Sequence, residues 1–191
     1  MTPPQDPERQ LDAELLTRVA KGDEAAFAQF YDRFSPGLYS FVLKMVHDEK
    51  EAEDILMEGF AQVWRRAETY DPARSSAFTW AVMVFRNKAI DRMRVKQRRQ
   101  RVVDMATEEF LTGPGSDDLS AAAPELREEH ALVRTALEQI PDEQKQAIAL
   151  AFFAGLTHEQ IAEKLAAPLG TVKARIRRGL LRLRDFLKEV A

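Results

Sequence analysis

Residues 156–184 of this chain are LTHEQIAEKLAAPLGTVKARIRRGLLRLR, and their pattern decides the fold class. A helix is predicted to begin at Thr157, because its hydroxyl can accept a hydrogen bond from the Gln160 amide while the Gln160 side chain bonds the Thr157 amide. Ile161 and Leu165 lie on one side of this helix and form its inward face. The stretch therefore opens with a capped amphipathic helix.

A second helix is predicted after a short turn. Pro168 and Gly170 disfavour continuation of the first helix, because proline lacks an amide donor and glycine bends at little cost. At about 100° per residue, one side of the second helix is apolar and carries Val172, Ile176, Gly179, Leu180 and Leu183. The opposite side carries Lys173, Ala174, Arg177 and Arg178.

The second helix is also strongly basic. Residues 173–184 include six basic and no acidic residues, whereas a merely solvated helix usually interleaves Glu for pairing. One side is expected to pack and the other to contact a partner. Because a helix, a turn and a basic helix is the arrangement that enters the major groove of DNA, the stretch predicts a DNA-binding domain.

Composition excludes several classes of site. The 191 residues are 45% hydrophobic, enough for one or two domains with cores, and include no cysteine. Disulfide frameworks, Cys-based zinc sites and thiol nucleophiles are therefore excluded. The histidines, His47, His130 and His158, are far apart, so neither a metal nor a cofactor is expected. No apolar run approaches about 18 residues, which predicts a cytoplasmic protein without membrane insertion.

The net charge of −3 conceals two oppositely charged segments. Residues 86–101 carry eight basic residues and one acid, whereas residues 104–129 carry eight acids and one base. The basic segment suits sequence-independent contact with phosphates, where counterion release contributes affinity.

The N-terminal part is predicted to be helical almost throughout. Apolar residues recur at three- and four-residue spacing across residues 8–101, with breaks expected at Gly22-Asp23 and at Ser35-Pro36-Gly37. A capped helix is predicted to begin at Asp48. Its aromatic residues are more typical of a core than of a ligand site.

A loop is predicted at residues 69–76, followed by a long helix from about 77 to 99. The loop region combines Arg74 and Ser75 with nearby aromatic residues, so it could hold an unstacked base, as single-strand binders do. Phe78 and Trp80, however, have the helical spacing of core residues.

The clearest linker is TGPGSDDLSAAAP at residues 112–124. The fold class is therefore all-α, with two helical domains at residues 8–101 and 125–191 joined by a flexible acidic linker at residues 102–124.

The order of motifs resembles the extracytoplasmic-function (ECF) group of the sigma-70 family of bacterial RNA polymerase sigma factors. The motifs that carry this resemblance are EAEDILMEGFAQVW at 51–64, Tyr70-Asp-Pro, Thr79-Trp80, Arg86-Asn-Lys-Ala-Ile-Asp91 with Arg94, and PLGTVKAR at 168–175. The resemblance extends from about residue 11 to residue 187, in the order and spacing of that family.

The resemblance implies a function for each domain. The N-terminal domain corresponds to sigma region 2, which docks on the β′ clamp helices of core RNA polymerase and opens the minus-10 element. The C-terminal domain corresponds to region 4, which recognises the minus-35 element of promoter DNA and contacts the β flap. A membrane-anchored anti-sigma factor is expected to compete for residues 54–64.

Candidate site residues follow from these motifs and from the charged surfaces. The candidates for binding core polymerase are Asp54, Glu58, Phe60 and Trp64. The candidates for the minus-10 element are Arg74, Ser75, Asn87, Lys88, Asp91, Arg92 and Arg94. The candidates for the minus-35 element are His158, Thr171, Lys173, Ala174, Arg175, Arg177 and Arg178.

The chain departs from the family pattern at a few positions. Met57 stands where the family often has Gln, and Ala174 where it often has Ser. Gly59 is a helix-weakening residue in the middle of a motif. Ala166 replaces the usual turn glycine, which is tolerable if that position stays helical.

Other functions are weaker alternatives. Asp54 and Glu58 are one helical turn apart but lack a third polar group, so they indicate a surface for an arginine-rich partner helix rather than a catalytic pair. No phosphate loop or nucleophile motif appears, so no enzyme activity is expected. A helix-turn-helix repressor or activator would leave the second basic segment unexplained. A sigma mimic that binds no DNA would leave the basic recognition face unexplained.

Overall fold

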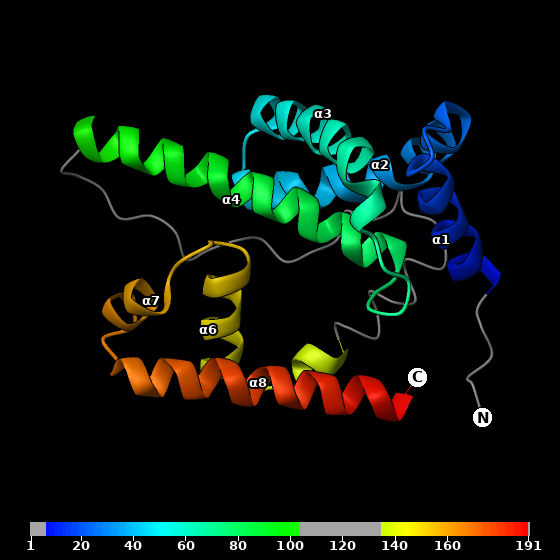
Figure 1. Ribbon diagram of the computed structural model, residues 1–191. Coiled ribbons are helices and arrows are strands. Elements are labelled where there is room, and N and C mark those ends of the chain that lie inside the picture. Colours follow the sequence, from blue (N-terminus) through cyan, green and yellow to red (C-terminus); the bar gives the residue numbers. More distant parts are fainter. Residues whose placement is uncertain (1–6, 104–134, 191) are drawn as a thin grey trace. The chain divides into compact units, whose positions relative to one another are not determined.

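The computed structural model describes residues 7–103 and 135–190, and all the regular structure in these residues is helical (Figure 1). The chain divides into two compact units, residues 1–122 and 123–191. The all-α fold class is confirmed. None of the described helices is long and apolar enough to cross a membrane.

The first unit contains α1 (Pro7–Val19), α2 (Glu24–Val46), α3 (Glu49–Arg66), the short 3-10 helix η1 (Ala67–Thr69) and α4 (Ala77–Val103). Figure 1 shows α3 and α4 side by side, and α2 packs against both. Apolar side chains from all of these elements form one core. This packing fixes the outward faces of α3 and α4, which carry most of the candidate polymerase and minus-10 residues.

Side-chain caps fix where two helices begin. The Asp23 carboxylate accepts a hydrogen bond from the Ala26 amide at 3.0 Å, and Asp48 accepts one from the Glu51 amide at 3.0 Å. These contacts satisfy amides that a helix N-terminus leaves without partners. The predicted break at Gly22-Asp23 and the predicted helix start at Asp48 are both confirmed.

The predicted break at Ser35-Pro36-Gly37 is wrong, because α2 continues through Pro36. A proline inside a helix costs about 3 kcal/mol through its missing amide and its ring. Phe34 and Leu38, on either side of it, are fully buried, and each such burial contributes about 1.5–3 kcal/mol. The core on one side of α2 therefore outweighs the local cost of Pro36, which is itself exposed.

The second unit has a helical turn at residues 135–138, then α6 (Asp142–Phe152), α7 (His158–Lys164) and α8 (Leu169–Val190). Leu150, Ile161 and Val172, one from each of these helices, are buried together and hold them in place. At the start of α7, Thr157 and Gln160 form the predicted reciprocal cap, with the Gln160 side chain 2.8 Å from the Thr157 amide. The predicted helix-turn-helix is confirmed.

Two details of the helix-turn-helix differ from expectation. Leu180, predicted on the packing side of α8, is 51% exposed, because α8 turns Gly179 toward Ile148 of α6 and the next residue lies about 100° around the helix. Ala166 does not stay helical, since its φ is +46° and α7 ends at Lys164. The turn therefore uses the left-handed conformation for which glycine is better suited.

The predicted linker lies almost entirely outside the described residues, which stop at 103 and resume at 135. Helix α4 includes residues 102 and 103, which the sequence assigned to the linker. Residues 125–134 of the predicted C-terminal domain also lie outside the described part.

Candidate nucleic-acid interface

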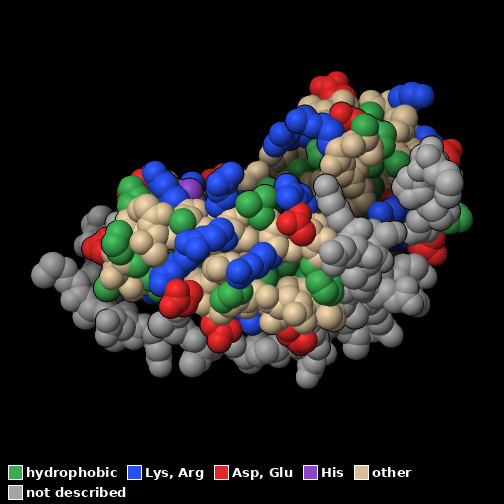
Figure 2. All heavy atoms as spheres, turned by 90° about the horizontal axis from the view of Figure 1, so that it is seen from below, with side chains coloured by type: hydrophobic (Ala, Val, Ile, Leu, Met, Phe, Trp, Pro, Cys, Tyr) green, Lys and Arg blue, Asp and Glu red, His purple; other side chains and the backbone are tan. Residues whose placement is uncertain are grey.

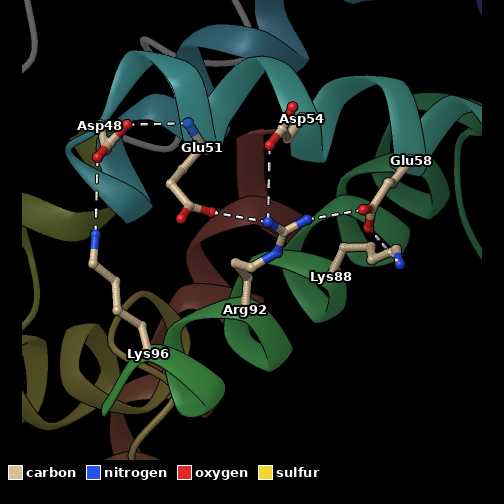
Figure 3. A network of polar contacts seen from close by, with 7 residues as sticks. All are labelled: Asp48, Glu51, Asp54, Glu58, Lys88, Arg92 and Lys96. Atoms are coloured by element: carbon tan, nitrogen blue, oxygen red, sulfur yellow. Dashed lines mark hydrogen bonds and ion pairs between the residues drawn. The ribbon is translucent and has the colours of Figure 1, made fainter. Parts of the chain in front are cut away.

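Charged side chains form a network between the outward faces of α3 and α4 (Figure 3). Arg92 of α4 is at its centre and faces three carboxylates of α3. Its guanidinium nitrogens lie 2.8 Å from Glu58, 3.1 Å from Glu51 and 3.9 Å from Asp54. The three acidic residues occupy positions i, i+3 and i+7, which places them along one side of α3.

Glu58 joins two cations of α4. Its second carboxylate oxygen lies 2.7 Å from the Lys88 ammonium group. The hydrogen bond from Lys88, together with the charges of Lys88 and Arg92, holds the pKa of Glu58 below its usual value. Glu58 is therefore held as a carboxylate between two positive groups, although its side chain remains 46% exposed.

The sequence placed these residues on two separate surfaces, whereas the structure brings them together. Asp54 and Glu58 were assigned to polymerase binding, and Lys88 and Arg92 to the minus-10 element. Helical periodicity describes one helix at a time, so it gave no sign that a basic stripe on α4 would face an acidic stripe on α3. The opposite charges of the two stripes were a signal that could have indicated this pairing.

The other minus-10 candidates on α4 follow a neighbouring stripe. Asn87, Asp91 and Arg94 are exposed, at spacings of four and three residues. The Asn87 side-chain oxygen accepts a 3.5 Å hydrogen bond from Arg86, and the rest of its amide group remains available. This stripe lies beside the Lys88–Arg92 stripe along the same helix.

The loop before α4 is held by an aromatic pair. The Tyr70 hydroxyl donates to the Ser75 carbonyl at 3.2 Å, and the Tyr70 ring meets the Trp80 ring edge to face at 5.9 Å. Phe78 packs on Phe34 with the ring centroids 5.5 Å apart. Phe78 and Trp80 thus contact the core, as their spacing predicted, and both are only half-buried.

The minus-10 candidates in this loop differ in accessibility. Arg74 is exposed, and Ser75 is half-buried. A polar loop therefore lies directly beside half-buried aromatic rings, at the start of the helix that carries Asn87.

Phe60 needs a correction, because it was assigned to the polymerase-binding surface and is only 3% exposed. Its ring lies among other aromatic rings, 4.5 Å from Tyr31 and 5.1 Å from Phe85. Burial of so large an apolar ring makes Phe60 a core residue that packs α3 against the other helices of the first unit. Trp64, one turn later, is half-buried with its ring 5.2 Å from Phe27, and keeps part of its surface outward.

In the second unit, α8 presents a basic surface. Lys173, Arg177 and Arg178 are exposed, while Thr171 and Ala174 beside them are half-buried. Figure 2 views the side on which α8 lies and shows Lys and Arg side chains gathered along that helix. His158, at the first position of α7, is also exposed.

Arg175 differs from its neighbours on α8. Its side chain is only 21% exposed and its guanidinium lies 2.6 Å from Glu143 of α6. The acid that pairs with Arg175 therefore comes from another helix, which the composition of α8 alone could not reveal. Arg182 likewise donates to the Gln144 side chain of α6 at 3.1 Å. Arg175, which the sequence assigned to the minus-35 element, thus ties α8 to α6 in this structure.

Within residues 7–103 and 135–190, no cluster of three His, Asp or Glu side chains could hold a metal ion. Among the charged groups described above, the basic ones lie mainly on α4 and α8 and the acidic ones on α3.

Comparison with known proteins identifies the family. Residues 30–99 match Sigma-70 region 2, and residues 136–185 match Sigma-70, region 4. The ECF RNA polymerase sigma factor SigK of Mycobacterium tuberculosis is 38% identical over 191 residues, covering 98% of each chain. The chain belongs to the ECF sigma factors. ECF sigma factor RpoE of Cereibacter sphaeroides is 36% identical over 165 residues, 86% of this chain and 88% of RpoE.

Among solved structures, Rhodobacter sphaeroides SigE in complex with the anti-sigma ChrR is 31% identical, with a TM-score of 0.46. The similarity covers 94% of this chain and 99% of SigE. In the ECF sigma factor described here, the α3–α4 network lies within the region 2 match and the basic face of α8 within the region 4 match. Sigma factors are specificity subunits of RNA polymerase.

Proposed function

We propose that this sigma factor binds core RNA polymerase through α3, recognises the minus-35 element with α8, and opens the minus-10 element with α4 and the preceding loop. The observation that carries this proposal is the two-sided character of α8. Val172 is fully buried against α7, while Lys173 and Arg177 are exposed on the same helix. A helix held from one side with free cations on the other can enter a major groove.

The chemistry of α8 suits duplex DNA. Arg177 can donate two parallel hydrogen bonds to a guanine edge, and Lys173 can reach a base or a phosphate. Arg178 is suited to phosphate contacts, which position the helix without recognising sequence. His158 and Thr171 lie at the starts of the two helices, where short polar groups commonly contact the DNA backbone.

The minus-10 element would be opened by the first unit. Asn87 offers both a donor and an acceptor to an exposed base edge. Arg74, Ser75 and the half-buried Trp80 at the start of α4 would receive the base that leaves the duplex. Asp91 and Arg94 would contact the neighbouring backbone or bases from the same stripe.

Core polymerase would dock on α3. Asp54 and Glu58 are exposed carboxylates, and the outward part of Trp64 adds an apolar contact one to two turns along. These groups complement the cationic β′ clamp helices, while the second unit would contact the β flap. An anti-sigma factor, expected from the family to be membrane-anchored, would compete for the same helix. All of these contacts would take place in the cytoplasm.

The test separates the two roles of the first unit. Charge reversal of Asp54 and Glu58 to Lys should abolish co-purification with core polymerase, because like charges would then face the partner. Asn87→Ala should retain co-purification and block open-complex formation, measured by permanganate reactivity of unpaired thymines. Reversal of Glu53, an exposed α3 residue that pairs with no described cation, is the matched control. Wild-type co-purification of the Asp54/Glu58 variant, or normal promoter opening by the Asn87 variant, would contradict the proposal.

A further inference from the structure

Glu58 belongs to two proposed surfaces at once. One of its oxygens lies 2.8 Å from Arg92 and the other lies 2.7 Å from Lys88 (Figure 3). Both cations are assigned to DNA, whereas Glu58 is assigned to polymerase. In this conformation Lys88 and Arg92, which are proposed to bind DNA, are paired with Glu58, which is proposed to bind polymerase.

Arg92 is engaged most fully. It contacts Glu58 and Glu51 at hydrogen-bond distance and has Asp54 at 3.9 Å, and its side chain is only 31% exposed. The three carboxylates around Arg92 outweigh its single positive charge, so the local net charge is negative and repels an approaching phosphate. Arg92 can bind DNA fully only after some of these contacts are given up.

These contacts are weak enough to exchange. Ion pairs between partly exposed side chains typically change an equilibrium by about two- to five-fold each. A docking surface that brings its own cations close to Glu58 and Asp54 can replace Lys88 and Arg92 as their partners. The released cations then face solvent beside the exposed Asn87 stripe.

We propose that the α3–α4 ion pairs couple the two binding events: a cationic partner that takes Glu58 and Asp54 releases Lys88 and Arg92 for DNA phosphates. The inference rests on the proposed function, in which α3 docks on polymerase and α4 binds DNA. The free protein keeps its minus-10 surface partly neutralised, and docking unmasks it. Because coupling between two binding sites is reciprocal, DNA at α4 also strengthens docking at α3.

The coupling predicts that removing a charge from one surface strengthens binding at the other surface. Removing the charge of Glu58 strengthens DNA binding by the free protein, because Lys88 and Arg92 lose their competitor. Removing the charge of Arg92 strengthens docking on polymerase, because Asp54 and Glu58 lose the cation that competes with polymerase for them. If the two surfaces were independent, neither substitution would affect the other partner in this way.

The first experiment measures DNA binding by the full-length chain without polymerase. Binding of Glu58→Gln to a labelled single-stranded oligonucleotide of mixed sequence is followed by fluorescence anisotropy over a range of salt concentrations. We expect about two- to five-fold tighter binding than wild type. The slope of log affinity against log salt should steepen by about 0.7 for each released cation.

The matched control is Glu53→Gln. It removes the same charge from the same helix, but Glu53 is exposed and pairs with no lysine or arginine among the described residues. In a Lys88→Gln/Arg92→Gln background, Glu58→Gln should tighten binding no more than Glu53→Gln does. Equal tightening by Glu58→Gln and Glu53→Gln in the wild-type background would overturn the proposal, since it would reflect net charge alone.

The second experiment titrates core polymerase with Arg92→Gln, for which we expect about two- to five-fold tighter docking. Unchanged or weaker docking would overturn the coupling. Circular dichroism and urea unfolding establish that each variant is folded, and Lys88→Gln replaces Arg92→Gln if the latter is not. The proposed function fails on a different result, wild-type docking of the Asp54/Glu58 charge reversal, so the two failures are distinguishable.

Discussion

Gly59 is required by the ring of Phe85. A Cβ atom at this position would lie 2.6 Å from Phe85 Cδ1 and 2.7 Å from Phe85 Cζ. Phe85 is fully buried and packs edge to face on Phe60, so its ring has little freedom to move. The glycine that the sequence marks as helix-weakening is the position where α3 leaves room for the Phe85 ring of α4.

Gly59→Ala should therefore destabilise the first unit by about 1–3 kcal/mol, the usual cost of forcing a methyl group into a packed core. Urea unfolding followed by circular dichroism measures the change. Gly170→Ala is the control, because a Cβ there meets nothing within 4 Å and alanine is the better helix former. A Gly59→Ala variant as stable as wild type would show that Phe85 can move aside.

Ala166 carries a different kind of strain. Its φ of +46° lies in the left-handed region, where a Cβ is unfavourable, and it follows the last turn of α7. Nearby hydrogen bonds hold the turn, with the Ala167 amide bonded to the Ala162 carbonyl at 3.0 Å. The turn geometry is thus imposed by the packing of α7 against α8, at the expense of local backbone preference.

Ala166→Gly should stabilise the second unit by about 1 kcal/mol, because glycine adopts this conformation without the Cβ penalty. Ala162→Gly, inside α7, should destabilise by about the same amount. Thermal unfolding of the two variants gives opposite shifts if the turn has the described geometry. A loss of stability in both would contradict it.

Helices α3 and α4 are joined by charges as well as by apolar packing. Lys96 of α4 lies 3.8 Å from Asp48 at the start of α3, so the network extends along both helices from Lys88 to Lys96. Such partly exposed pairs add little stability singly. The apolar core decides which stripes of the two helices face each other, and the ion pairs lie between these stripes.

This pairing makes stability depend on pH through Glu58. The pKa of Glu58 is lowered, chiefly by the hydrogen bond from Lys88, so its contribution is present above the ordinary carboxyl pKa of about 4.3 and is lost as pH falls through the lowered value. The melting temperature of wild type should exceed that of Glu58→Gln near neutral pH. The difference should shrink below about pH 4.3 and vanish in stronger acid. A difference that stays constant with pH would exclude this role for Glu58.

Helix α8 carries one arginine paired with α6, Arg175, and exposed arginines for which we propose contacts with DNA. Arg177→Ala should cost about 1–3 kcal/mol of binding to the minus-35 element and relax base preference there, as expected for an exposed base-contacting arginine. Arg175→Ala should chiefly remove the ion pair with Glu143 and lower stability slightly. Competition binding with specific and random duplexes separates the two effects. Equal loss of specific and random binding in Arg177→Ala would contradict its assignment.

The molecule is organised as two helical units with different charged surfaces. The unit that matches region 2 carries both an acidic and a basic surface, and the unit that matches region 4 carries a basic helix. The residues from 112 to 124, which lie outside the described part, are rich in Gly, Pro, Ser and Asp. Such a composition favours a spacer over a packed core.

Scrambling residues 112–124 at constant composition should therefore leave the affinity for core polymerase unchanged. The spacer's negative charge would be retained, so its repulsion from the DNA backbone would be retained as well. Co-purification of the scrambled variant with core polymerase measures this. A large loss of affinity would instead identify the segment as a specific contact.

The sequence by itself determined the helical class, the helix-turn-helix and its cap at Thr157, the long helix from Ala77 and the family. The helical features depend on periodicity and on contacts between residues a few positions apart, which the order of residues contains directly. The family followed from the resemblance of its ordered motifs to those of the ECF sigma factors. It also indicated the basic face of α8, since Lys173 and Arg177 differ from their packing neighbours by fixed angles around one helix.

Only the tertiary structure decided the contacts between helices. It showed that α2 runs through Pro36, that Phe60 belongs to the core and that Arg175 pairs with Glu143. It also joined Glu58 to Lys88 and Arg92, residues that sequence reasoning had given to different partners. The physical reason is that such contacts depend on which faces of separate helices meet, and burial in a shared core decides this over local propensity.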